Sequence, residues 1–287
     1  MKTQELERDE TLHGEYDARA MGRPKLDYSN SLASLFHENT KLTDLSSRVL
    51  GRRVQAFKAP YFIKRSVQPY KVYPGKDLLS LPDRRAAVPN RSNLFDLIDG
   101  RQSRRQYADA PLTLEEIGTL LAFTYGITRE ASVASVEDAT QEYRAVPSPG
   151  ALYPLEQYVM LFNAELEPGL YHYRPDEHGL EHLETGDFRD AVDEASFASA
   201  TMALEDAGAL VLTTAVFERV LLKYGDRGYR FVCLEAGLAA QNLSLVGEAL
   251  DVGTCMVGGY KDDAFHDLLD VDGTSEALLN LFVIGSA

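Results

Sequence analysis

A lysine and a tyrosine stand side by side at Lys223 and Tyr224, directly before Gly225 and ahead of a long apolar pattern. Burial lowers the pKa of a lysine, so a desolvated lysine can act as a general base near neutral pH. The tyrosine offers a second group whose proton affinity burial can shift. A surface lysine beside a half-buried tyrosine is the plainer alternative. Because other motifs accompany it, we take Lys223 and Tyr224 as the candidate catalytic pair.

Arg101, Ser103 and Arg105 alternate along a short segment between two predicted helices. In an extended backbone, alternate side chains project to the same side. Two guanidinium groups and a hydroxyl on one side can hold a phosphate. Arg104 then points away, and we expect it to face solvent. A solvated basic loop is the alternative interpretation.

Two further segments could approach a planar ligand or an anion closely. Gly258 and Gly259 follow a short apolar run and offer backbone amides without side-chain obstruction. Residues 147–154 form a rigid, proline-rich loop that enters a predicted strand and presents backbone amides. Within this loop the candidate ligand-binding residues are Pro147, Ser148 and Gly150. An ordinary turn is the alternative for each segment.

Other familiar chemistries lack their motifs. The sequence has no Gly-x-Gly-x-x-Gly, Walker loop or Gly-x-Ser-x-Gly elbow, which argues against a Rossmann dehydrogenase, a nucleotide hydrolase and an esterase. His172, His178 and His182 fall on a predicted hairpin, where we expect surface polar roles and no metal site. The two cysteines, Cys233 and Cys255, are not spaced as zinc ligands, and we expect Cys255 to be a small buried thiol.

Composition limits the class of protein. The chain has 287 residues, 45% hydrophobic and 25% charged, enough to bury the core of one large domain. Its net charge of −15 disfavours nucleic acid and anionic membranes as partners, because both repel an acidic protein. Residues 1–14 do not resemble a signal peptide, and no apolar run is long enough to cross a bilayer. We expect a cytoplasmic protein.

Strands alternate with helices from about residue 92 onward, which predicts an α+β fold. Thr113 and Glu116 form a capping box for a helix that stops near Gly126. A shorter helix is expected at residues 93–98. Strand-length apolar runs cover residues 157–163, 209–217, 255–257 and 278–284, and a hairpin is expected at residues 169–174 and 179–184.

The strongest helical pattern follows Arg230 and continues to about residue 250. One apolar face contains Val232, Ala236, Ala239 and Leu243, and a second contains Phe231, Leu234, Leu238 and Leu245. Two apolar faces imply burial on both sides, at the centre of the domain or against a partner subunit. We favour a dimer interface, in which Gln241 and Asn242 need hydrogen bonds.

Residues 1–90 have a different texture, in which basic and aromatic residues mix with prolines and apolar periodicity is weak. No unit recurs at a fixed period. We expect an N-terminal extension that packs irregularly on the core or the dimer, followed by a domain that covers residues 91–287.

Taken together and in this order, the motifs resemble those of the nitroreductase superfamily, and more narrowly of the SagB-type (thiazole/oxazole-forming, ThcOx-like) dehydrogenases. The resemblance covers about residue 90 to the end. The segments that carry it are residues 101–107, 147–154, 169–173, 223–225, 235–237, 241–243 and 258–259. Residues 36–41 and 73–75 look like the N-terminal extension of that family.

The resemblance implies a nitroreductase-like α+β fold that binds FMN, with a central, mainly antiparallel sheet flanked by helices. It also implies a homodimer that holds the flavin between subunits. By this resemblance, Arg101, Ser103 and Arg105 hold the phosphate and ribityl chain, and the amides around Gly258 and Gly259 face flavin N5. Likewise, Pro147, Ser148 and Gly150 approach the ring from the partner chain, and Lys223 and Tyr224 are the catalytic pair.

The leading functional hypothesis is an FMN-dependent dehydrogenase that oxidises a thiazoline or oxazoline on a peptide or small scaffold to the azole. Dioxygen would reoxidise the flavin, and cyclodehydratase partners would supply the substrate. An NAD(P)H-dependent nitro or quinone reductase of the same fold is one alternative. A flavin-less scaffold subunit of a biosynthetic complex is another. Loops such as residues 128–144 carry no pattern that predicts the substrate.

Overall fold

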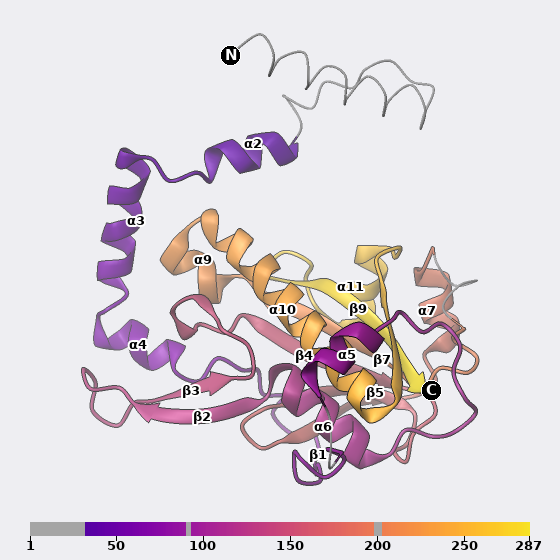
Figure 1. The fold of residues 1–287 in the computed structure, drawn as a ribbon. Helices are drawn as coiled ribbons and strands as arrows, with labels where there is room; N and C mark the ends of the chain where they lie inside the picture. The colour runs from indigo at the N-terminus through magenta and orange to yellow at the C-terminus, as the bar shows by residue number, and fades with distance from the viewer. Residues whose placement is uncertain (1–31, 90–92, 198–202) are drawn as a thin grey trace, which may run out of the picture. The chain divides into compact units, whose positions relative to one another are not determined.

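The computed structural model describes residues 32–89, 93–197 and 203–287 (Figure 1). The expected domain boundary at residues 90–91 and the polar residues 1–14 lie outside these ranges. The chain divides into two compact units, Met1–Val49 and Leu50–Ala287. The candidate site residues all belong to the second unit.

Seven antiparallel strands form the central sheet, in the order β1-β6-β5-β4-β7-β9-β8. The strands are β1 (Leu78–Ser80), β4 (Leu155–Leu161), β5 (Gly169–Arg174), β6 (Gly179–Thr185), β7 (Ala209–Val216), β8 (Val252–Val257) and β9 (Glu276–Ser286). A separate hairpin pairs β2 (Ile127–Ser132) with β3 (Thr140–Arg144). Residues 128–144, which were expected to form a loop, are thus mostly a β-hairpin. The expected α+β fold with an antiparallel sheet is confirmed.

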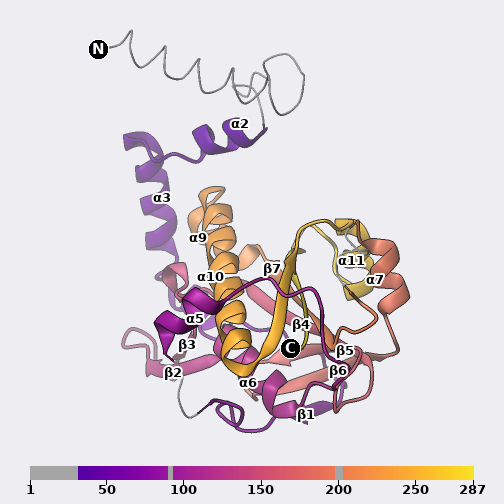
Figure 2. The same ribbon diagram turned by 45° about the vertical axis from the view of Figure 1, so that its right-hand side comes forward.

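Helices cover both faces of the sheet (Figure 2). From residue 60 onward the described α-helices are α4 (Pro60–Ser66), α5 (Leu94–Gly100), α6 (Leu114–Tyr125), α7 (Arg189–Ala195), α9 (Glu218–Tyr224), α10 (Arg227–Leu250) and α11 (Asp262–Leu269), of which α6, α7, α10 and α11 pack on the sheet. Along β4, Tyr158 and Met160 pack with α7 and α11, whereas Val159 and Leu161 pack with α6 and α10. Because successive side chains of a strand point to opposite faces, a strand covered on both faces is apolar throughout.

The local predictions for helices agree well with the structure. The capping box is present, since Thr113 accepts a hydrogen bond from the amide of Glu116 and the Glu116 carboxylate accepts one from the amide of Thr113. The first predicted apolar face of α10, with Val232 and Leu243, is buried. Asn242 donates a hydrogen bond to the carbonyl of Phe123 at 3.2 Å. The helix begins at Arg227, four residues before the expected apolar pattern, because Asp226 and Arg227 already follow the chain reversal at Gly225.

Within the first 90 residues, which were expected to form an irregularly packed extension, residues 32–66 contain helices. This part contains α2 (Leu32–Asn39) and α3 (Asp44–Ala56) as well as α4. None of the three helices contains a buried residue. A helix that buries no side chain needs no apolar stripe, so its sequence shows no helical periodicity.

Residues 67–77, here called the strap, are held on the sheet by buried carboxylates. The amide of Lys71 donates to Glu156 Oε1 at 2.9 Å, and its ammonium group donates to Glu276 Oε2 at 2.8 Å. The amide of Tyr73 donates to Glu181 Oε1 at 3.1 Å. The strap therefore contacts β4, β6 and β9 through these carboxylates, and Tyr73 also packs against the apolar core.

His172 lies at the centre of this network, and the expectation of a surface role is wrong for it. Its side chain is 0% exposed, and its two ring nitrogens donate to Glu181 and Glu156, each at 2.9 Å. Burial lowers the pKa of His172, but the hydrogen bonds to the two carboxylates outweigh it and raise the pKa overall. Burial also opposes ionisation of Glu156, yet Arg219 and His172 lower its pKa to about 2. An imidazolium between two carboxylates accounts for both shifts.

Candidate functional site

Lys223 and Tyr224 end the short helix α9, where the chain reverses into α10. Gly225 has φ +59° and ψ −153°, a conformation essentially restricted to glycine, and its amide donates to the carbonyl of Leu221 at 2.8 Å. The Tyr224 ring packs edge-on against Phe231 on the first turns of α10, with ring centroids 5.1 Å apart. The reversal therefore fixes the directions of both candidate catalytic side chains.

The ends of these two side chains meet at Gly150. A Cβ atom at Gly150 would lie 2.5 Å from Lys223 Nζ and 2.7 Å from Tyr224 Oη, and the residue has φ +69°. The positive φ favours glycine, and any larger residue would displace the ends of both side chains. No sequence pattern predicted this contact within one chain, because the resemblance assigned Gly150 to the partner side of the site. Lys223 Nζ also lies 5.2 Å from the ring centroid of Phe57.

Burial sets the proton affinities of the pair in opposite directions. It lowers the pKa of Lys223 and raises the pKa of Tyr224. In the described ranges no carboxylate lies within 4 Å of Lys223 Nζ to reverse the effect. A lysine of this kind is more easily neutral than a solvated one, and the phenol stays protonated. The two groups can thus serve as a proton acceptor and a hydrogen-bond donor at one point.

Glu235, behind the loop of residues 147–154, is a buried acid. The sequence motifs include it only within residues 235–237 and assign it no role. Its side chain is 1% exposed, and Tyr125 donates to its Oε1 at 2.6 Å. Its Oε2 has no hydrogen-bond partner among the described residues. Burial raises the pKa of Glu235 to about 7, although Ser148 and Tyr125 lower it. The nearby Ser148 hydroxyl accepts from the amide of Tyr153 at 2.9 Å, and Pro147 is exposed on the outer side of the loop.

The segment that carries Arg101, Ser103 and Arg105 runs beside β8. Ser103 and Arg105 are exposed and Arg101 is half-buried. In the described part of the chain neither arginine has a carboxylate within 4 Å, so both guanidinium groups are available to an anion. The expectation that Arg104 faces solvent is wrong, because its guanidinium group forms ion pairs. It pairs with Glu248 at 3.6 Å and with Asp251 at 3.5 Å, both at the end of α10.

Gly258 and Gly259 follow β8 directly. A Cβ atom at Gly258 would meet no atom of the described chain within 4 Å, so one side of this glycine is open. Gly259 is half-buried, and its carbonyl accepts hydrogen bonds from the amide of Phe197 at 2.8 Å and the hydroxyl of Ser196 at 3.2 Å. The neighbouring Cys255 is buried, as expected, and Cys233 is exposed.

The structure brings the candidate residues together as two groups and not as one. Gly150, Lys223 and Tyr224 meet near the start of α10. The arginine segment lies at the other end, where a Cβ atom at Gly100 would be 3.1 Å from Glu248. A helix of 24 residues is about 36 Å long. Lys223 and Tyr224 therefore lie far from the arginine segment within one chain.

The described ranges contain neither a metal-binding cluster nor a helix that could span a membrane. They contain no group of three His, Cys, Asp or Glu residues that could hold a metal ion. Of the helices described, none combines the length and apolar character that a bilayer span requires.

Three curated relatives are similar to this chain. A Methanocaldococcus jannaschii protein named as a nitroreductase is 33% identical over 179 residues, which is 62% of this chain and 84% of the relative. The microcin B17-processing protein McbC of Escherichia coli is 30% identical over 47% of this chain and 52% of its own length. The trifolitoxin-processing protein TfxB of Rhizobium leguminosarum is 28% identical over 61% and 48%. The chain thus matches about half of the length of McbC and TfxB.

Solved structures agree with these matches. A nitroreductase-type protein of Anabaena variabilis superimposes with a TM-score of 0.67 at 28% identity, over 88% of this chain and 45% of the other. The Escherichia coli microcin synthetase McbBCD complex contains a chain that matches with a TM-score of 0.53 at 21% identity, over 90% and 99%, which supports the fold alone. Residues 98–286 match the nitroreductase family. The chain belongs to the nitroreductase family, as its motifs indicated.

Proposed function

We propose that this protein is an FMN-dependent dehydrogenase of the SagB type, which oxidises a thiazoline or oxazoline to the azole on a peptide or a related small scaffold. Membership of the nitroreductase family supports an oxidoreductase. Similarity to McbC and TfxB, whose names describe the processing of microcin B17 and trifolitoxin, supports peptide maturation. The proposal implies partners that form the azoline, such as a cyclodehydratase.

The residues present fit FMN. The unpaired guanidinium groups of Arg101 and Arg105, with the Ser103 hydroxyl between them, suit a phosphate. The open side of Gly258 leaves room for the close approach of a flat ring, with amides there and at Gly259 that can face its N5. When bound, FMN supplies a two-electron acceptor for a hydride, and dioxygen takes up the electrons afterwards.

The reaction needs a base beside the ring, and Lys223 provides it. Oxidation of an azoline removes two electrons and two hydrogens, one as a hydride and one as a proton. Neutral Lys223 takes the proton from the carbon alpha to the carbonyl at Nζ, and the protonated Tyr224 phenol beside it can donate a hydrogen bond to the substrate. The ring gains one double bond and becomes aromatic, which supplies the driving force.

A homodimer would unite the two groups of candidate residues. The arginine segment and Gly258 of one subunit would hold the flavin, while the loop with Pro147, Ser148 and Gly150 of the other would bring Lys223 to it. The face of α10 that remains uncovered in the single chain supports this arrangement, because Leu234 is 66% exposed and Leu238 is 44% exposed. Apolar side chains on one stripe of a helix favour a second subunit.

The convergence of Lys223 and Tyr224 on Gly150 carries the proposal, and one experiment tests it. Protein reconstituted with FMN is mixed anaerobically with a thiazoline peptide, and loss of the yellow flavin absorbance is followed. Wild type should bleach, and Lys223→Ala should keep its colour but lose bleaching by about 100-fold or more. A Lys223→Ala variant that bleaches at the wild-type rate would refute the role of Lys223 as base.

The same assay separates the alternatives. Rapid bleaching by NAD(P)H but not by azolines would favour a nitro or quinone reductase, the activity that the name of the Methanocaldococcus relative suggests. Protein that stays colourless after reconstitution would favour a scaffold subunit. Arg101→Ala should weaken FMN retention, and undiminished retention would contradict the phosphate site.

A further inference from the structure

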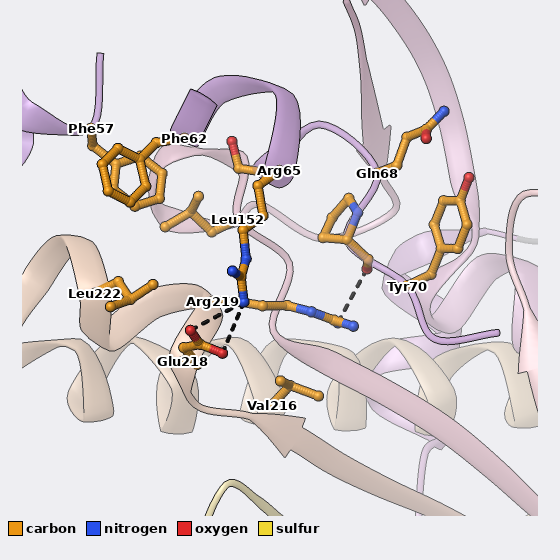
Figure 3. A pocket seen from close by; sticks show the side chains of 12 residues that line it. Phe57, Phe62, Arg65, Gln68, Tyr70, Leu152, Val216, Glu218, Arg219 and Leu222 are labelled. Atoms are coloured by element: carbon orange, nitrogen blue, oxygen red, sulfur yellow. Dashed lines mark hydrogen bonds and ion pairs between the residues drawn. The ribbon is translucent and has the colours of Figure 1, made fainter. Parts of the chain in front are cut away.

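A pocket of about 210 Å³ lies between α4, the start of the strap and α9 (Figure 3). Its walls are mainly apolar, and Phe57 and Phe62 stack on one side with ring centroids 5.2 Å apart. Leu152 and Leu222 complete the apolar lining next to these rings. Pockets that enclose whole drug-sized ligands have about 300–1,000 Å³. This one has the size for a side chain.

The pocket shares its walls with the candidate catalytic pair. Phe57 lines it and also lies under Lys223, with Nζ 5.2 Å from its ring centroid. Leu222 directly precedes Lys223, and Leu152 follows Gly150 by two residues. The pocket therefore lies next to the candidate catalytic pair, with the Phe57 ring as a shared wall.

The charges at the pocket are already paired. Arg65 contacts both carboxylate oxygens of Glu218 at 3.1 Å at the exposed rim. Arg219 donates to the carbonyls of Pro69 and Tyr153 at 3.2 Å, and its other nitrogen donates to Glu156 at 2.5 Å. With no unpaired charge in the lining, the pocket favours a neutral occupant over an anion or a cation. Gln68 is exposed at the rim.

We propose that this pocket binds a neutral aromatic side chain of the substrate, next to the ring that is oxidised at Lys223. The proposal rests on the proposed function for the nature of the substrate, and it adds a determinant of specificity. Two stacked phenyl rings offer an edge or a face to a third, which is the arrangement that aromatic groups prefer. The strap and α4, which lie before the region of the family match, then select the residue beside the azoline.

Binding is tested first, independently of turnover. N-acetyl-phenylalanine amide and N-acetyl-glycine amide serve as probes, and their affinities for the FMN-reconstituted protein are compared by saturation-transfer NMR. Wild type should bind the phenylalanine probe at least about tenfold more tightly. Leu222→Trp, which fills the pocket, should abolish the difference, and Leu78→Trp is the control because Leu78 is 41% exposed and Leu222 is 45% exposed.

The sequence contains no tryptophan, so each variant carries a single indole whose emission reports its surroundings. The indole of Leu222→Trp should emit at shorter wavelength than that of Leu78→Trp if it enters the pocket. Phe62→Ala removes one wall and should also reduce the preference. Equal binding of the two probes to wild type would overturn the proposal, whatever the variants do.

Turnover then links the pocket to the reaction. The phenylalanine probe should raise the KM for an azoline peptide without changing kcat, and a phenylalanine next to the azoline should lower KM relative to glycine. Binding of the probe without any effect on KM would contradict a substrate pocket. If no azoline bleaches the flavin, the proposed function fails, while the binding comparison still decides whether the pocket takes an aromatic side chain.

Discussion

Gly150→Ala tests the contact on which the candidate site depends. The new Cβ atom would lie 2.5 Å from Lys223 Nζ, and ordinary contact begins near 3.4 Å, so the ammonium group must move by about 0.9 Å. Tyr224 Oη, at 2.7 Å, must move by about 0.7 Å as well. Both atoms end their side chains, so these movements add little to the cost of folding. The left-handed backbone at φ +69° costs an alanine about 1–2 kcal/mol. We therefore expect a small loss of stability and a large loss of rate.

The expected loss of rate is about 100-fold, since a displacement of about 1 Å at a reacting group commonly has this effect. Urea unfolding measures stability, and anaerobic bleaching of the flavin by an azoline peptide measures the rate. Gly75→Ala is the matched control, because Gly75 has φ +83° and open space around its Cβ position. It should lose similar stability and keep its rate.

The double variant Gly150→Ala/Lys223→Ala gives the sharpest comparison. If the alanine acts by displacing the lysine, the double variant should be no slower than Lys223→Ala alone. Full activity of Gly150→Ala would refute the reasoning. If Gly150→Ala slows the reaction by the same factor in wild type and in Lys223→Ala, Gly150 acts through some other contact.

Three further variants test the electrostatics and the local structure. The raised pKa of Glu235, about 7 against 4.5, contributes stability that is full below pH 4.5 and lost as the pH rises through about 7. Glu235→Gln should therefore abolish a fall of about 3 kcal/mol in the free energy of unfolding across this window, and a curve as steep as that of wild type would contradict it. Glu156→Gln removes the carboxylate that Arg219 and His172 share, leaving His172 with Glu181 alone, and should cost about 3–5 kcal/mol in urea unfolding at neutral pH, whereas a loss below about 1 kcal/mol would show that the charges are not coupled. Thr113→Ala should lower the free energy of unfolding by about 1 kcal/mol, and no change would speak against the capping box.

Local signals predicted local structure. The capping box at Thr113 needs only residues three positions apart, and the hairpin of β5 and β6 is set by its own turn. The central strands were recognisable because burial on both faces leaves an unbroken apolar run. The positions of these elements followed from their own sequences to within a few residues.

Contacts between distant segments could not be predicted in the same way. The alternation around Arg104 predicted that it faces solvent, whereas Glu248 and Asp251 at the end of α10 lie beside it. His172 lies on a strand whose pattern says nothing of the carboxylates of Glu156 and Glu181 on neighbouring strands. Charge pairs formed by the tertiary fold have no local pattern.

No sequence pattern predicted the contact of Phe57 with Lys223, for a related reason. α3 and α4, on either side of Phe57, bury no residue, so nothing in this region marks one aromatic residue as special. Only the folded chain shows that a residue before the family match lies at the candidate site.

The strap has a consequence for the order in which the chain folds. It is synthesised early, but its partners Glu156, Glu181 and Glu276 follow Lys71 and Tyr73 by 85, 108 and 205 residues. Glu276 begins β9, the last strand, so the ammonium group of Lys71 has no lasting partner there until almost the whole chain has left the ribosome. Contacts across such separations form late. The wall of the pocket formed by the strap is thus completed at the end of folding, and a chain interrupted before β9 leaves it unfinished.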